Sequence, residues 1–255
     1  MTVAREREQR LLASIARDVA DVLASIATLR EATVEVFAGA DAAGRPVDRA
    51  ALATLHPLIA RLLRRHEGFA AGAGVVLAPD VLADAPRWIE WWWADRGSGI
   101  ERLAVDHDPD SVDFYDYTAA EWYSEPERTR QQSITGPYVD YICTHEYTYT
   151  LAIPLIYGER FVGVAGADIL AQQVERAVVP ELMQLEHVAV LASGNGRIIA
   201  SNTVLYPPGN VLARHEASHE LLPVAGHGAA DDPVAGISLP WTLLAGGEVD
   251  SIRGR

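Results

Sequence analysis

Aromatic rings and carboxylates alternate at short intervals between residues 122 and 168, and these two residue types together can bind a cationic ligand. A carboxylate attracts a positive charge, and the face of an aromatic ring attracts it as well. Asp140 follows Tyr138 by two residues, and Asp168 ends an apolar, glycine-containing run. Because apolar walls with a few placed polar groups are typical of small-molecule pockets, this stretch is the first candidate for a binding site.

A helix and three strands must bring these groups together. Trp122 lies in a predicted helix, and the residues that follow are rich in β-branched and aromatic types, which favour strands. Gly158 lies between two apolar runs, as the turn of a hairpin does. Since side chains two residues apart on a strand share a face, Tyr138 and Asp140 point to the same side. The pattern predicts an antiparallel sheet with a ring and a carboxylate on one surface.

The stretch resembles the ligand-binding module of double Cache sensor domains, the PDC-type, PAS-like domains of bacterial chemoreceptors and histidine kinases. In the amino-acid-binding branch, an Arg precedes a Trp-Tyr pair by two residues, a Tyr-x-Asp follows on the next strand, and an Asp ends a Gly-rich strand. The matching positions here are Trp122, Tyr123, Tyr138, Asp140 and Asp168. By the order of helices and strands, the resemblance extends over roughly residues 70–172.

Ala120 stands where that branch has its Arg. The resemblance implies that an arginine there holds a ligand carboxylate through two parallel hydrogen bonds, which nothing else in the motif supplies. This chain keeps the acidic pair and lacks the cation. The resemblance therefore implies a ligand with an amine group rather than a free α-amino acid.

Tyr115 and Trp88 are two further candidates for ligand contact. Trp88 belongs to the run WIEWWWAD, in which successive residues of a strand face opposite ways. A role in the core is the default for such rings, and a ligand cage on one face of the strand is the alternative. For Asp140 and Asp168, the alternative to ligand binding is an internal salt bridge or a strand-end cap.

The composition excludes several function classes. The chain has 255 residues, 49% of them hydrophobic, and a formal net charge of −14. This acidic balance argues against nucleic-acid partners and against an anionic membrane surface. No stretch approaches the ~18 continuous apolar residues of a membrane span, and the N-terminal region lacks a signal-peptide core. We therefore expect a cytoplasmic protein, although most members of the sensor family are membrane-anchored.

A long helix is expected over residues 5–36, because its apolar residues alternate by three and four positions, as in an a/d seam. These residues are Leu12, Ile15, Val19, Val22, Ile26 and Leu29. The seam can pack on the chain's own second helix, which is expected over 48–65 with Asp48 as its N-cap. It can equally pair across a homodimer, and both alternatives remain open.

These patterns predict an α+β fold in which a long N-terminal helix precedes two PAS-like antiparallel-sheet modules, the second one small, as in a double Cache domain. The expected divisions are an N-terminal helical segment at 1–66, a distal ligand-binding module at 67–172 and a proximal module at 173–255. The proximal module is expected to begin with a hairpin that turns at 194–196 and to end with a strand over 237–244.

One catalytic motif also occurs. His215, Glu216 and His219 form HExxH, in which two His one helical turn apart bind Zn²⁺ and the Glu activates water. A short helix over 210–222 would place both His on one face. However, Leu222 and Ala225 stand where the metzincin pattern has a Gly and a third His. A zinc-dependent hydrolase is therefore the alternative to a binding module.

The expected function is a sensor domain rather than an enzyme, with no cofactor. It would bind a small polar, amine-bearing metabolite. Because the sequence shows no kinase, methyl-accepting or DNA-binding segment, it would signal through a separate partner protein. Cys143 is the single cysteine, so no internal disulfide can form.

Overall fold

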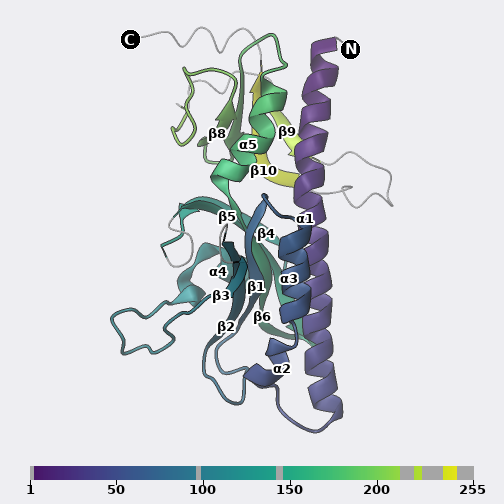
Figure 1. Ribbon diagram of the computed structural model, residues 1–255, viewed down its shortest axis with the longest axis vertical. Coiled ribbons are helices and arrows are strands. Elements are labelled where there is room, and N and C mark those ends of the chain that lie inside the picture. Colours follow the sequence, from purple (N-terminus) through teal and green to yellow (C-terminus); the bar gives the residue numbers. More distant parts are fainter. Residues whose placement is uncertain (1–2, 96–98, 142–145, 213–220, 226–237, 246–255) are drawn as a thin grey trace. The chain divides into compact units, whose positions relative to one another are not determined.

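The computed structural model describes residues 3–95, 99–141, 146–212, 221–225 and 238–245 (Figure 1). The chain divides into two compact units, one formed by Val22–Leu170 and the other by Met1–Asp21 with Ala171–Arg255. The first helix, α1 (Val3–Ala42), contributes to both units. The ranges expected from the sequence instead place this helix in a segment of its own, and those ranges stay a prediction.

An antiparallel sheet dominates the larger unit, and its described residues form six strands in the order β3-β2-β1-β6-β5-β4. The strands are β1 (Ala70–Leu77), β2 (Trp88–Asp95), β3 (Gly99–Arg102), β4 (Ser133–Val139), β5 (Tyr147–Tyr157) and β6 (Arg160–Leu170). The hairpin expected at Gly158 joins β5 to β6, with Tyr157 paired to Arg160. The antiparallel sheet predicted from the alternating residues is therefore confirmed.

Short helices accompany this sheet. The larger unit holds α2 (Arg49–Ala53), α3 (His56–Arg65), the short 3-10 helix η1 (Tyr117–Ala119) and α4 (Glu121–Thr129). Asp48 caps α2 as expected, because its Oδ1 accepts a hydrogen bond from the Ala51 N–H at 2.8 Å. The single helix expected over 48–65 is wrong, since Pro57 in the first turn of α3 has no N–H to continue the hydrogen-bond ladder from α2.

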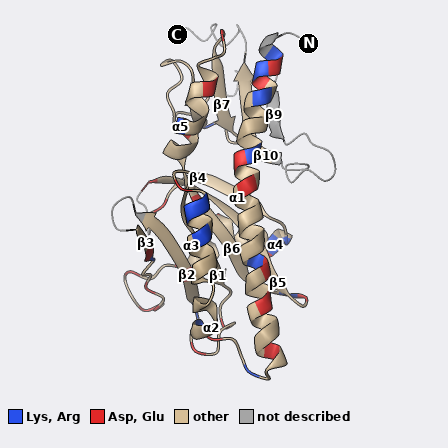
Figure 2. Ribbon diagram, turned by 45° about the vertical axis from the view of Figure 1, so that its right-hand side comes forward, with Lys and Arg blue, Asp and Glu red and all other residues tan. Residues whose placement is uncertain are grey.

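The apolar seam of α1 is filled by packing within the chain. All six of its residues are buried, with exposed fractions between 0% and 6%. In the larger unit, Ser25 on α1 hydrogen-bonds at 2.9 Å to His66, the C-cap residue of α3, and Figure 1 shows the two helices side by side. A homodimer through α1, which stays a prediction, would have to use the exposed face of this helix, where charges of both signs occur (Figure 2).

The smaller unit contains a second antiparallel sheet, with the order β8-β7-β10-β9 in its described part. Its elements are α5 (Ala171–Leu182), β7 (Ala189–Ser193), β8 (Ile198–Ser201), β9 (Leu221–Ala225) and β10 (Ser238–Ala245). The expected hairpin is present as β7-β8, and the expected final strand as β10.

The helix expected over 210–222 is wrong where the chain is described, because Leu221 and Leu222 belong to β9 and pair with β10. His215, Glu216 and His219 lie outside the described residues, so the zinc-hydrolase alternative stays untested. Of the helices that are described, none is long and apolar enough to cross a bilayer.

Candidate ligand-binding site

A cavity in the larger unit is enclosed by strands of the sheet, by α4 and by the loop before it. The space between its lining atoms is about 400 Å³, part of it open to solvent. The lining residues are Val76, Ile89, Trp91, Leu103, Tyr115, Trp122, Tyr138, Asp140, Thr150 and Asp168. Five of the seven residues predicted to contact a ligand are among them, namely Tyr115, Trp122, Tyr138, Asp140 and Asp168.

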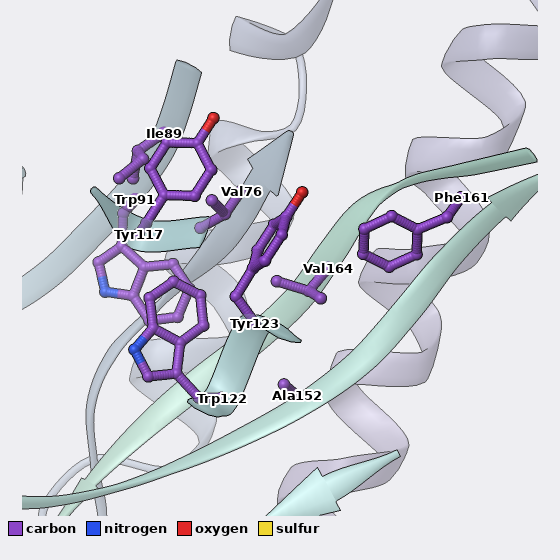
Figure 3. Close-up of a cluster of buried hydrophobic side chains, with 9 residues drawn as sticks. All are labelled: Val76, Ile89, Trp91, Tyr117, Trp122, Tyr123, Ala152, Phe161 and Val164. Atoms are coloured by element: carbon purple, nitrogen blue, oxygen red, sulfur yellow. The ribbon is translucent and has the colours of Figure 1, made fainter. Parts of the chain in front are cut away.

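The apolar wall is built on two indole rings. Trp91 from β2 and Trp122 from α4 belong to one hydrophobic cluster and are 5% and 8% exposed (Figure 3). Trp91 fits against the sheet because β1 and β6 carry glycines beneath it. A Cβ on Gly72 would lie 2.7 Å from Trp91 Nε1, and a Cβ on Gly166 would lie 3.3 Å from the ring. These two glycines are the sequence signal that would have identified Trp91 as a wall of the cavity.

Three strands meet at the polar end of the cavity. Thr150 on β5 is paired with Asp168 on β6, and its Oγ1 donates a hydrogen bond to Asp168 Oδ1 at 2.6 Å. The Tyr138 hydroxyl on β4 lies 2.5 Å from the same Thr150 oxygen. Asp140 contributes a second buried carboxylate to the lining. The result is a hydrogen-bonded chain, Tyr138 to Thr150 to Asp168, with Asp140 as the second acid of the lining.

Burial controls the electrostatics of this corner. Asp168 is 6% exposed, and its pKa is raised to about 7, mainly by desolvation; the hydrogen bond from Thr150 acts against this shift, and the Asp140 charge adds to it. Desolvation, aided by both carboxylates, raises the pKa of Tyr115 to about 12 and also raises the pKa of Tyr138. Both phenols therefore stay neutral at physiological pH.

The cavity lining contains two carboxyl groups and no Lys, Arg or His among the residues that the structure describes. Nowhere in these described parts of the chain do three or more His, Cys, Asp or Glu gather as a metal ion would require. The chemistry that the arrangement supports is the binding of a cation with an apolar body, since rings cover one end and acids the other.

Tyr123 is not among the residues that line the cavity, and its predicted role in ligand binding stays a prediction. It is fully buried, and its ring packs edge-on against Tyr117 at 5.3 Å and Phe161 at 5.6 Å (Figure 3). Consecutive residues on a helix point about 100° apart, so only Trp122 of the pair can face the cavity. Tyr123 instead forms part of the core that supports α4.

Trp88 does not line the cavity either. It lies three residues before Trp91 on β2 and so faces the other side of the strand. There its Nε1 donates to Glu90 Oε2 at 3.2 Å, and the Arg102 guanidinium lies 4.5 Å from its ring centre. Trp88 therefore helps to satisfy the buried carboxylate of Glu90, which Trp92 and Arg102 also contact.

Gly72→Ala tests how closely the Trp91 ring packs against β1. The added Cβ would meet Trp91 Nε1 at 2.7 Å, so the ring must shift. We expect a loss of about 1–3 kcal/mol in the free energy of unfolding, measured by urea denaturation, together with weaker ligand binding. Gly39→Ala is the control, because a Cβ on this α1 residue meets nothing within 4 Å and should stabilise the helix. Equal stabilities for Gly72→Ala and the wild type would contradict the close packing of the Trp91 ring over Gly72.

Residues 56–176 match the family model for the first PDC sensor domain of methyl-accepting chemotaxis protein-like proteins. This range contains the six-stranded sheet and every residue that lines the cavity. Residues 56–176 form a PDC sensor domain. Among curated protein sequences, none matches the chain significantly.

Solved structures share the fold of the PDC domain and its flanks. One, of methyl-accepting chemotaxis protein X, has a TM-score of 0.70 at 18% identity over 95% of both chains. Another, the extracellular domain of a putative histidine kinase, mmHK1S-Z3, has a TM-score of 0.60 at 16% identity over 100% of both chains. A third is the ligand-binding domain of the Pseudomonas aeruginosa PAO1 amino acid chemoreceptor PctC in complex with GABA. Its TM-score is 0.53 at 15% identity, over 91% of this chain and 93% of that one. The predicted Cache-type α+β fold with a smaller second module is thereby confirmed.

Proposed function

We propose that the PDC domain is a sensor for a small amine-bearing metabolite and that the chain transmits occupancy to a separate partner protein. The observation that carries this proposal is the polarity of the cavity. Asp140 and Asp168 are both buried in its lining, and no basic residue lies there among the described residues. The buried carboxylate of Asp168 is costly unless a positive charge accompanies it, and an ammonium group of the ligand would supply that charge.

The aromatic residues suit the rest of such a ligand. Trp91, Trp122 and Tyr115 would cover a short apolar body and add cation–π attraction to the ammonium. A ligand carboxylate, in contrast, would face two acids, and the described lining residues offer it no cation. The GABA complex of the PctC domain supports an amino compound as ligand for this fold. In this chain the residues favour the ammonium end of such a compound over its carboxylate end.

A thermal-shift panel of small alkylamines, α-amino acids and carboxylates tests the proposal. An amine at a hundred times its Kd should stabilise the protein by about 2.7 kcal/mol, and the melting temperature should rise accordingly. We expect amines to raise the melting temperature and carboxylates to leave it unchanged. Stabilisation by carboxylates alone, or by no compound in the panel, would contradict the proposed amine-sensing function.

Ala120→Arg tests the origin of the amine preference. Ala120 precedes α4 and packs against the hydrophobic cluster that contains Trp122, at the position where the amino-acid-binding branch has an arginine. A guanidinium there can pair with a ligand carboxylate, so we expect affinity for α-amino acids to rise about tenfold, as a charge-assisted hydrogen bond allows. Calorimetric titration measures this gain.

Ala119→Arg provides the matched control, because it adds the same charge at an exposed neighbouring residue. If both variants gain amino-acid affinity equally, general electrostatics rather than a carboxylate contact is responsible. If Ala120→Arg gains none, the position does not face the ligand's carboxylate.

Two features of this proposal concern the whole molecule. We propose that the protein acts by binding rather than by catalysis, because apolar rings and a few placed polar groups line the cavity, as in a recognition site. The cytoplasmic location and the homodimer expected from the sequence remain proposals. Size-exclusion chromatography with light scattering would detect the dimer, and a monomeric mass in the presence of ligand would contradict it.

A further inference from the structure

We propose that the site selects primary ammonium groups over N-methylated ones, because the Tyr138-Thr150-Asp168 chain presents hydrogen-bond acceptors to the ligand. This inference rests on the proposed function and specifies which amines the site takes. Aromatic walls alone would favour the opposite class, since quaternary ammonium ions bind well to rings. The hydrogen-bonded chain is therefore what decides between the two.

The direction of each hydrogen bond between Tyr138, Thr150 and Asp168 follows from the number of hydrogens that each hydroxyl or carboxylate carries. The Thr150 hydroxyl has one hydrogen, and an ionised carboxylate only accepts. Thr150 therefore donates to Asp168 Oδ1, at 2.6 Å. The Tyr138 hydroxyl, 2.5 Å from Thr150 Oγ1, must then donate its own hydrogen to Thr150. The Tyr138 oxygen is left with lone pairs and no hydrogen for a ligand.

The second carboxylate oxygen of Asp168 lies on the side of Gly72 and Trp91. It lies 3.4 Å from the point where a Cβ on Gly72 would stand, and that point is 2.7 Å from Trp91 Nε1. Tyr138 and Asp168 both line the cavity. A ligand nitrogen at this corner thus meets acceptor oxygens from two strands, and it needs several N–H groups to satisfy them.

The number of N–H groups on the ligand then sets its affinity. A primary ammonium has three, and each methyl group removes one without changing the charge. A buried acceptor that loses its partner keeps the cost of having left water. An N-methyl group also needs space that the short hydrogen bonds of the corner do not offer. We expect the quaternary ion to bind at least about tenfold more weakly than the primary amine, the loss that one unsatisfied buried acceptor produces.

A methylation series tests this inference by calorimetric titration of the wild-type protein at pH 8. The ligands are propylamine, N-methylpropylamine, N,N-dimethylpropylamine and the trimethylpropylammonium ion, which all carry one positive charge. We expect Kd to increase along the series. If the quaternary ion binds as tightly as propylamine or more tightly, the inference is wrong while the amine sensor stands. If no member binds, the proposed function fails and the inference with it.

Thr150→Val and Tyr138→Phe test whether the hydrogen-bonded chain of Tyr138, Thr150 and Asp168 causes the selectivity for primary amines. Valine keeps the shape of threonine and suits a buried strand, but it removes the donor to Asp168 and releases the Tyr138 hydrogen. Phenylalanine keeps the ring and removes one acceptor. In both variants we expect propylamine binding to weaken more than binding of the quaternary ion, and therefore a smaller ratio of the two affinities. A merely structural role would weaken both ligands equally, and an unchanged ratio in both variants would overturn the proposal.

Discussion

Asp168→Asn should abolish amine binding and should make the ligand-free protein more stable at pH 8. The amide has the shape of the carboxylate, and its oxygen can still accept the hydrogen bond from Thr150. It cannot neutralise an ammonium group. Leaving a buried charge without its partner costs about 3–5 kcal/mol, so we expect affinity to fall by at least about a hundredfold in a calorimetric titration.

The expected gain in stability of Asp168→Asn comes from the removal of the buried negative charge. Burial raises the pKa of Asp168 from 3.8 to about 7, so the folded protein holds this proton more tightly than the unfolded chain does. As pH rises from about 4 to 7, the wild type therefore loses stability, and above pH 7 the whole cost of the buried charge is present. Each pKa unit corresponds to about 1.4 kcal/mol, which makes this cost about 4 kcal/mol at most. Asn at this position carries no such cost.

Urea unfolding at pH 5 and pH 8 measures the effect on stability. The advantage of Asp168→Asn over the wild type should be larger at pH 8 than at pH 5. Glu159→Gln removes one negative charge at the exposed β5-β6 turn and serves as the control. Amine binding by Asp168→Asn within threefold of the wild type would contradict the assignment, and so would an equal stabilisation by Glu159→Gln.

Amine affinity should fall as the pH drops below about 7. Protonation of Asp168 competes with the ammonium group, so each pH unit below its raised pKa should weaken binding about tenfold. The other titratable groups that face Asp168 in the cavity are Asp140, Tyr115 and Tyr138. The raised pKa values of the two phenols keep them neutral throughout this range. Alkylamines stay protonated as well, so the pH dependence arises from Asp168.

Proton release provides an independent measurement of the same linkage. At pH 6 Asp168 is mainly protonated in the ligand-free protein and ionised in the complex, so binding should release close to one proton. Titrations in two buffers with different ionisation enthalpies detect that proton. In Asp168→Asn any residual binding should release none. An affinity that stays constant between pH 5.5 and pH 8 would show that Asp168 does not carry the ligand's charge.

Much of this site follows from strand alternation. The two-residue spacing of Tyr138 and Asp140 places both in the lining, and the alternation along β2 separates Trp91 from Trp88. Alternation does not say which face of β2 is the inner one. That choice depends on the neighbouring strands, where Gly72 and Gly166 leave room for the ring of Trp91.

Thr150 could not be predicted because its partner depends on an irregularity in the hairpin. Continuous pairing from the Tyr157-Arg160 turn would place Tyr149 opposite Asp168. A register shift between Leu155 and Ile156 instead pairs Thr150 with Asp168. Gly163, which has φ +143 and lies next to the shift, was the available signal, since a glycine inside a strand often marks a bulge.

If the cavity recognises an ammonium group and not a carboxylate, four-carbon ligands that differ only in these two groups should bind with different affinities. Butylamine carries only the ammonium, butyrate carries only the carboxylate, and GABA carries both. The measurement is the calorimetric titration of the wild-type protein with each compound at pH 8. We expect that butylamine binds, that butyrate does not, and that GABA binds more weakly than butylamine because its carboxylate meets two acids and no cation in the described lining. Binding of butyrate, or tighter binding of GABA than of butylamine, would contradict this expectation.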